Sequence, residues 1–178
     1  FCEEALITGS SSVHHALRCG VAIAEELGGT APDWDAAADS LGHALRAHPE
    51  LFTPKTEFSM DWYYPVLGGV MVGDQAQDRL DSLWDRFVVD GLGIRCVDHR
   101  PWVTGAETCE LVLALEAAGR HEQALQQFTN MQHLRDTDGS YWTGHAARGG
   151  RPVAHHAGQR DLPLRLGPHH AAVAPRTG

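Results

Sequence analysis

The sequence lacks the features that mark several large classes of protein. Its 178 residues carry 14 lysines and arginines against 23 acidic residues, a net charge of −9. No basic face precedes the C-terminal segment, so we expect no nucleic-acid partner. No apolar run approaches the roughly 20 residues that a membrane-spanning helix needs, so we expect no membrane span and a cytoplasmic location.

Cysteine is scarce and scattered along the chain. No two cysteines form a CxxC pair, and none has a histidine at the spacing of metal ligands. The four are Cys2, Cys19, Cys96 and Cys109. This pattern predicts reduced, buried thiols, and we expect neither a bound metal nor another cofactor.

The most informative segment is 98–119, where a loop with charged and aromatic residues runs into an almost wholly apolar stretch. Thr104 and Glu107 have the spacing of a capping box, in which each side chain satisfies a free backbone N–H at the start of a helix. Gly119 is suited to a C-cap. The sequence therefore predicts a helix from Thr104 to Gly119, buried on most sides, whose polar N-terminus faces an enclosed cavity.

Two kinds of helix alternate along residues 1–144. Apolar helices are expected to start near Ser10, Asp61 and Thr104, and an amphipathic helix follows each of them. The amphipathic helices fall in 32–48, 74–89 and 121–134, and residues 94–97 are expected to form a short extended connection. The apolar helices recur at roughly 40 to 50 residues, the period of helical repeat architectures. The predicted fold class is all-α, a partial (α/α)6 toroid of about three helical hairpins with an irregular C-terminal tail.

The first residue of the chain is not a methionine. The chain begins at Phe1, so we expect a C-terminal fragment of a longer protein. Three hairpins make about half of a closed toroid and leave the inner helix faces uncovered. We therefore expect the fragment alone to be inactive and prone to aggregate.

In a toroid, the loops that lead into the inner helices lie at one end. Three of the five tryptophans fall in these loops. We call them the leading loops; they span residues 8–12, 58–65, 98–107 and 138–144. Because aromatic and charged residues gather there, we expect the ligand cavity at this end.

Two acids of the leading loops are candidate catalytic residues. Asp61 and Glu107 stand at the starts of neighbouring inner helices, where paired carboxylates can act as acid and base on a glycosidic bond. The alternative is that both are only helix caps, with Asp61 as N-cap and Pro65 in the first turn. Capping a helix and lining a cavity are compatible roles.

The neighbouring aromatic and charged residues are candidates for substrate binding. Trp62, Tyr63 and Trp102 have ring faces suited to stacking on sugars. Asp98 and Arg100 form either a structural ion pair or an anion clamp for a phosphate. The full candidate set for substrate binding is Trp62, Tyr63, Asp98, Arg100, Trp102, Tyr141 and Trp142.

Residues 145–178 differ from residues 1–144 and are treated as a separate segment. They include five arginines, five histidines, one acid and no aromatic residue, and they show no helical or strand period. Three interpretations stay open: a disordered basic tail, a histidine-rich metal-binding segment, or an out-of-frame reading that begins near Gly144. Out-of-frame GC-rich codons give mainly Arg, Ala, Gly, Pro and His. Sequencing an independent copy of the gene tests the third interpretation, which an unchanged frame through Gly144 would exclude.

Four motifs resemble those of an actinobacterial family labelled prenyltransferase-like. They are LITGSSSVHHALRC (6–19), FSMDWYYPVLGG (58–69), GLGIRCVD (91–98) and RPWVTGAETCE (100–110). The resemblance covers residues 1–144. It implies a six-hairpin toroid, related in shape to the six-hairpin glycosidases and to the terpenoid cyclase and prenyltransferase toroids.

The family label itself is less well supported by the residues. Segment 134–141 is similar to the Q-x-x-D-G-S-W element of squalene and terpene cyclases, but Arg135 replaces its Gln and Tyr141 its Trp. The D-x-D-D acid motif of a cyclase is absent. Cys109 has no evident partners for the zinc site of a protein prenyltransferase.

These observations favour a carbohydrate or glycan as the small-molecule partner, acted on or bound in a cavity lined by acids and aromatic rings. One alternative is transfer of a prenyl group, with Arg100 holding the diphosphate and aromatic rings shielding an allylic cation. A second alternative is a non-catalytic binding scaffold. The absence of a metal or diphosphate signature favours the sugar.

Overall fold

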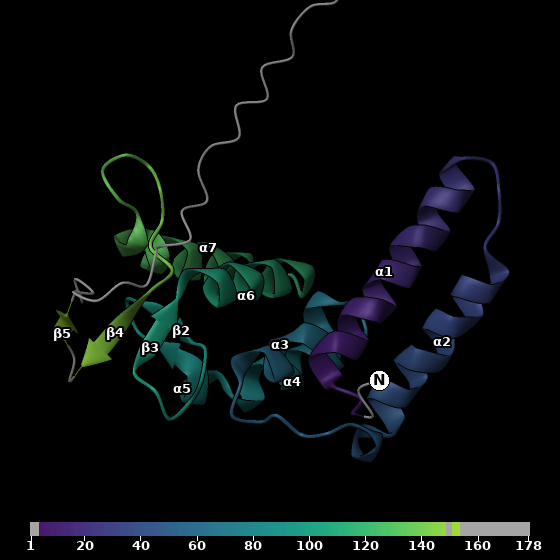
Figure 1. Cartoon of the computed structure of the whole chain (residues 1–178), viewed down its shortest axis with the longest axis horizontal. Coiled ribbons are helices and arrows are strands. Elements are labelled where there is room, and N and C mark those ends of the chain that lie inside the picture. Colours follow the sequence, from purple (N-terminus) through teal and green to yellow (C-terminus); the bar gives the residue numbers. More distant parts are fainter. Residues whose placement is uncertain (1–3, 149–150, 154–178) are drawn as a thin grey trace, which may run out of the picture.

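The structure is a computed structural model and describes residues 4–148 and 151–153. It is mostly helical, with one small antiparallel sheet beside the helices (Figure 1). The prediction of a mainly helical chain is confirmed at this level. The sheet was not expected beyond a short extended piece near residues 94–97.

Helices occupy all six predicted places and form three successive hairpins, but the helix predicted over 74–89 is divided into two at Leu83, and its last two residues, 88–89, form a strand instead. The elements are α1 (Ile7–Glu26), α2 (Pro32–Ala47), η1 (Pro49–Leu51), α3 (Ser59–Leu67), α4 (Asp74–Ser82), α5 (Trp84–Phe87), α6 (Gly105–Ala117), α7 (His121–Asn130) and η2 (Met131–Leu134). Each apolar helix packs on the amphipathic helix that follows it, and α3 also packs against both α1 and α6. The three apolar helices are therefore neighbours in chain order.

The sheet is a meander of five short strands in sequence order. They are β1 (Val88–Val89), β2 (Gly93–Arg95), β3 (Trp102–Thr104), β4 (Gly144–Arg148) and β5 (Arg151–Val153). The register pairs Ile94 with Thr104, and Thr104 with Gly144. The sheet thus joins the loop that precedes α6 to the chain that follows η2.

The main core lies between α3, α4, α5, α6 and the sheet. Its members include Trp62, Phe87, Ile94, Leu111 and Leu115, all of which are nearly or fully buried. A smaller cluster of Leu45, Phe52 and Val70 fixes η1 and the end of α3 against α2. Burial of this apolar surface is the main term that holds the three hairpins together.

Pro65 lies inside α3 and not in its first turn. The expected start of this helix near Asp61 is therefore wrong by two residues. The helix begins at Ser59 with Phe58 at the N-cap position, so Asp61 is its third residue and not its cap. Pro65 has no N–H to donate to the carbonyl of Asp61, four residues earlier. Arg79 of α4 takes that place: its Nη2 donates to the Asp61 carbonyl at 2.6 Å, and its Nε donates to the Trp62 carbonyl at 2.9 Å.

Helix α6 begins where it was expected but is capped differently. Thr104 is at the N-cap position, yet its hydroxyl makes no capping bond and finds no partner among the described residues. The capping box with Glu107 is therefore wrong. Gly119 follows the helix with φ +75°, as a C-cap glycine does.

Two of the three apolar helices, α1 and α6, are less buried than expected. Helix α6 buries one side only, because Leu113 on its other side is more than half exposed. Helix α1 buries only Ser11 and His14 along its length, while Val13 and Ile23 face outwards. Within the part of the chain that the structure describes, the hairpins thus cover one side of α1 and α6, whereas no residue of α3 is exposed.

Part of the segment that begins at residue 145 is described. Residues of β4 and β5 pair with each other and with β3, so this part carries regular structure that its composition did not suggest. The positions 149–150 and 154–178, on which most of the expected tail falls, lie outside the described residues. The boundary at Gly144 and the out-of-frame interpretation stay predictions.

Candidate functional site

Backbone hydrogen bonds join the segments that precede the three apolar helices. Residues 8–12 and 59–65 of the leading loops are not loops but lie within α1 and α3. The N–H of Thr53 donates to the carbonyl of Ala5, the N–H of Ser59 to that of Cys96, and the N–H of Gly105 to that of Thr143, at 2.8, 3.0 and 3.0 Å. The segment before α1 thus lies beside the segment before α3, the start of α3 beside the segment before α6, and the start of α6 beside the chain that follows η2.

A carboxylate on α6 is held by two tyrosines of α3. The Tyr63 hydroxyl donates to Oε2 of Glu110 at 2.6 Å, and the Tyr64 hydroxyl donates to Oε1 at 2.9 Å. Burial, followed by the bond to Glu110, raises the pKa of Tyr63 strongly and that of Tyr64 to about 12. Both tyrosines therefore stay protonated donors at neutral pH and fix the orientation of the Glu110 carboxylate.

Glu107 lies one helical turn before Glu110 and is partly exposed. Its carboxylate acts on the thiol of Cys96, which lies just after β2. Burial, followed by the effect of Glu107, raises the pKa of Cys96 to about 12. The thiol is therefore protonated and is not a nucleophile. Two carboxylates on neighbouring turns of one helix, facing α3 and the sheet, form the acidic centre of the candidate site.

Asp61, the other predicted catalytic acid, has a different environment. Its side chain is 5% exposed, and it accepts hydrogen bonds from the Thr8 hydroxyl at 2.8 Å and from the backbone N–H of Lys55 at 2.9 Å. Both carboxylate oxygens thus tie the start of α1 and the loop before α3 to helix α3. This structural role accounts for a carboxylate at Asp61, and its catalytic role stays a prediction.

Trp62 does not offer a ring face to a ligand. It is 1% exposed, its ring stacks on Phe87 with centroids 5.7 Å apart, and its Nε1 donates to the Arg79 carbonyl at 2.6 Å. The expectation that Trp62 stacks on a sugar is therefore wrong, because the same apolar ring completes the core. Tyr63 is also fully buried and reaches the site only through its hydroxyl.

Asp98 and Arg100 are not paired with each other. Asp98 instead bonds to Arg86, whose Nε donates at 2.8 Å, and to Nδ1 of His99 at 3.0 Å. Arg86 holds the pKa of Asp98 below its usual range. The expected ion pair with Arg100 is thus replaced by one that ties the loop to α5.

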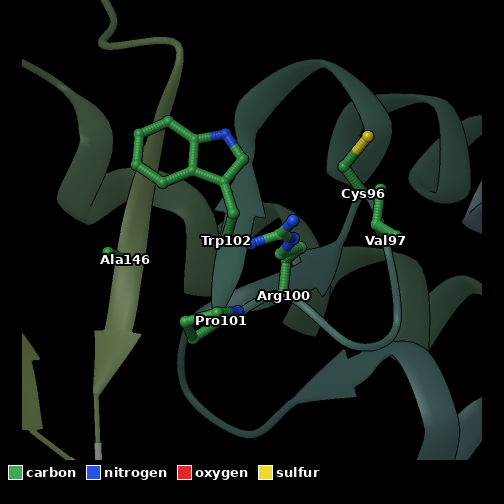
Figure 2. A pocket seen from close by; sticks show the side chains of 6 residues that line it. All are labelled: Cys96, Val97, Arg100, Pro101, Trp102 and Ala146. Atoms are coloured by element: carbon green, nitrogen blue, oxygen red, sulfur yellow. The ribbon is translucent and has the colours of Figure 1, made fainter.

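Arg100 and Trp102 line a small pocket of about 310 Å³. Figure 2 shows Arg100 beside Trp102, with Cys96 and Val97 on the same pocket. Because Glu107 influences the pKa of Cys96, which lines this pocket, the pocket adjoins the acidic centre. The Trp102 ring lies over Gly144 of β4, where an added Cβ would come within 3.0 Å of it.

Tyr141 and Trp142 line a second cavity, beside the first turns of α6. Its volume is about 630 Å³, and we call it the aromatic cavity. It is lined by Gly105, Ala106, Cys109, Phe128, Met131, Tyr141, Trp142 and Thr143. Four of the seven predicted binding residues are therefore divided between two cavities, and Trp62, Tyr63 and Asp98 line neither of them.

Comparison with known proteins gives one informative match, and no family model matches the chain. The chain is 58% identical over 142 residues to a protein of Mycolicibacterium hassiacum named MMP endo-(1,4)-3-O-methyl-alpha-D-mannosidase. The match covers 80% of this chain and 40% of that protein, so the chain spans about two fifths of its relative's length. The relative's name describes a glycosidase and not a prenyltransferase.

Sequence reasoning missed one carboxylate of the acidic centre, Glu110, and two of the residues around the centre, Tyr64 and Cys96. Glu110 was quoted only within a motif, although its spacing of three from Glu107 puts both on one side of a helix. Tyr64 directly follows a predicted site residue. The sequence gave no reason to group Cys96 with Glu107, because the β2–β3 connection separates the two residues along the chain.

Other site types were also sought among the described residues. Within 4–148 and 151–153, no group of three or more His, Cys, Asp or Glu side chains is arranged to hold a metal ion. Over the same residues, no helix has the length and apolar character needed to cross a membrane.

Proposed function

We propose that the chain is part of a glycoside hydrolase that cleaves within a (1,4)-linked polymer of 3-O-methyl-α-D-mannose. The observation that carries this proposal is the 58% identity over 142 residues with a mannosidase of that name. A match that spans 142 of the 178 residues includes positions 37–142, which contain the acidic centre and all the residues that line the two cavities except Thr143 and Ala146. The proposal agrees with the carbohydrate function favoured by the sequence.

The acidic centre supplies the chemistry that glycoside hydrolysis needs. One carboxyl group must protonate the leaving oxygen, and a second carboxylate must activate water or attack the anomeric carbon. We assign proton transfer to Glu107, which is partly exposed and has the neutral thiol of Cys96 as a neighbour. Glu110, held by two tyrosines, is the second carboxylate on this helix; Asp61 is the alternative to it.

We also propose that the three hairpins belong to an (α/α)6 toroid. The supporting observations are the chain-order packing of α1, α3 and α6 and the four leading loops at one end. The exposed sides of α1 and α6 are where further hairpins would pack. A relative about two and a half times as long as the matched stretch leaves room for them.

The proposal is tested with a substrate panel. The full-length protein is incubated with a (1,4)-linked 3-O-methylmannose oligosaccharide, with an unmethylated mannan oligosaccharide, and with farnesyl diphosphate plus an acceptor peptide. Products are separated by chromatography and identified by mass spectrometry. We expect internal cleavage of the methylated oligosaccharide. Prenylated product without sugar cleavage would contradict the proposal.

A further inference from the structure

Three exposed aromatic side chains line the aromatic cavity. Trp142 is 50% exposed, and Phe128 and Tyr141 are exposed to a similar degree. All three line this one cavity, together with Met131 and the first turns of α6. Exposed aromatic rings that converge on one concave site mark a ligand-binding surface better than rings scattered singly.

The polar groups on its wall are neutral, and two of them are already bonded. None of the described residues that line the cavity carries a charged side chain. The Cys109 thiol donates to the sulfur of Met131 at 3.2 Å, and burial raises its pKa, so it remains a thiol. The Tyr141 hydroxyl donates to Gln132 at 2.7 Å. The cavity is therefore suited to an uncharged ligand with apolar surface.

An O-methylated sugar has the matching chemistry. The apolar face of a pyranose ring stacks on an aromatic ring, and a 3-O-methyl group replaces a hydroxyl donor with a methyl. Against an apolar wall, the free hydroxyl of plain mannose would be left without a partner, which costs free energy, whereas the methyl group gains from burial. The same wall thus favours the methylated ring over the plain one.

The cavity also lies close to the acidic centre. Gly105, Ala106 and Cys109 line it from the same first turns of α6 that carry Glu107 and Glu110. Gly105 allows the approach of η2, because an added Cβ would come within 3.3 Å of Leu134 Cδ1. A polymer chain that crosses the start of α6 would occupy the cavity and the acidic centre together.

We propose that the aromatic cavity is a subsite that holds a 3-O-methylated mannose unit, with its methyl group against the Trp142, Phe128 and Met131 wall. This inference rests on the proposed hydrolysis of the methylated polymer and adds the place where methylation is recognised. Burial of one methyl group is worth about 0.8 kcal/mol. The proposal therefore predicts that the methylated ligand binds with a dissociation constant roughly fourfold lower for each methyl group that is buried.

The test compares binding of methylated and unmethylated oligosaccharides of equal length by isothermal titration calorimetry. We expect Trp142→Ala to bring the ratio of the two dissociation constants close to one, while the unmethylated ligand still binds. Trp34→Ala is the matched control, because Trp34 is 51% exposed on α2, away from the cavity. The ratio should not change in this control.

A second pair of variants tests the other wall and guards against misfolding. Phe128→Ala should also lower the preference, whereas Leu125→Ala, at an exposed position on the same helix outside the cavity, should not. An unchanged preference in both Trp142→Ala and Phe128→Ala, with wild-type cleavage intact, would overturn the subsite and leave the proposed function standing. If the wild-type protein neither binds nor cleaves either oligosaccharide, the proposed function and the subsite both fail.

Discussion

The bonds that Arg79 makes to α3 lead to a prediction about stability. Arg79 donates to the Asp61 carbonyl, which Pro65 leaves without a helical partner, and to the Trp62 carbonyl. Burial lowers the pKa of this guanidinium, while the charge of Asp61 acts in the opposite direction. Hydrogen bonds that involve a charged group contribute about 1.5–3 kcal/mol each. Arg79→Met should therefore lower the free energy of unfolding by about 3 kcal/mol.

The role of Pro65 gives this prediction a second, sharper part. In Pro65→Ala, the new backbone N–H can donate to the Asp61 carbonyl, so the same Arg79→Met change should cost about 1–1.5 kcal/mol less in that background. The difference is measured by urea denaturation of the four proteins of the double-mutant cycle. Arg135→Met, at an exposed arginine, is the control. Equal costs in the two backgrounds, or a cost of Arg79→Met no larger than that of the control, would refute the reasoning.

Three further predictions concern single side chains. Because the folded protein raises the pKa of Tyr64 from its ordinary value of about 10 to about 12, it holds the phenol proton more tightly than the unfolded chain. The stability that Tyr64 contributes is complete below pH 10 and is lost as the pH rises to about 12. The melting temperature of Tyr64→Phe should therefore fall less steeply between pH 10 and 12 than that of the wild type. An equally steep fall in the variant would contradict this prediction. Gly93→Ala should destabilise by about 1–3 kcal/mol in urea denaturation, because Gly93 has φ +124° and its Cβ would lie 2.6 Å from Thr108 Oγ1, whereas Gly9→Ala in open space on α1 should be neutral or stabilising. Asp61→Asn should lose one of the two hydrogen bonds that the carboxylate accepts, which lowers the free energy of unfolding by about 1–3 kcal/mol. A hundredfold loss of turnover in the folded variant would show that Asp61 is also catalytic.

The sequence predicted the helices well because each is encoded locally. Apolar spacing placed all six predicted helices, and Gly119 marked the end of α6. The starts were predicted less well, since Thr104 was expected to bond through its side chain and Asp61 to be a cap. A cap depends on side-chain geometry, and Pro65 was tolerated inside α3 only because Arg79, far along the chain, supplies the missing donor.

The site was harder to predict because it depends on contacts between distant segments. The four leading loops could be grouped from the alternation of helices, and Glu107 lies among them. Which aromatic ring is buried could not be read from the sequence: Trp62 and Trp142 look alike there, but one stacks on Phe87 and the other lines a cavity. Glu110 owes its orientation to hydroxyls 46 and 47 residues away.

The most direct test of the central claim is the rate of cleavage of a 3-O-methylmannose oligosaccharide by carboxylate variants. Glu107→Gln and Glu110→Gln remove the two acids of the proposed centre, and Glu116→Gln makes the same change at an exposed position near the end of α6. Because general acid–base catalysis contributes about 10²–10⁴-fold, we expect both centre variants of the full-length protein to lose at least a hundredfold in kcat, with Glu116→Gln unaffected. Glu107→Gln should melt near the wild-type temperature, and Glu110→Gln, which changes the acceptor of two tyrosine hydroxyls, should still unfold cooperatively. Full activity in Glu107→Gln would contradict the account.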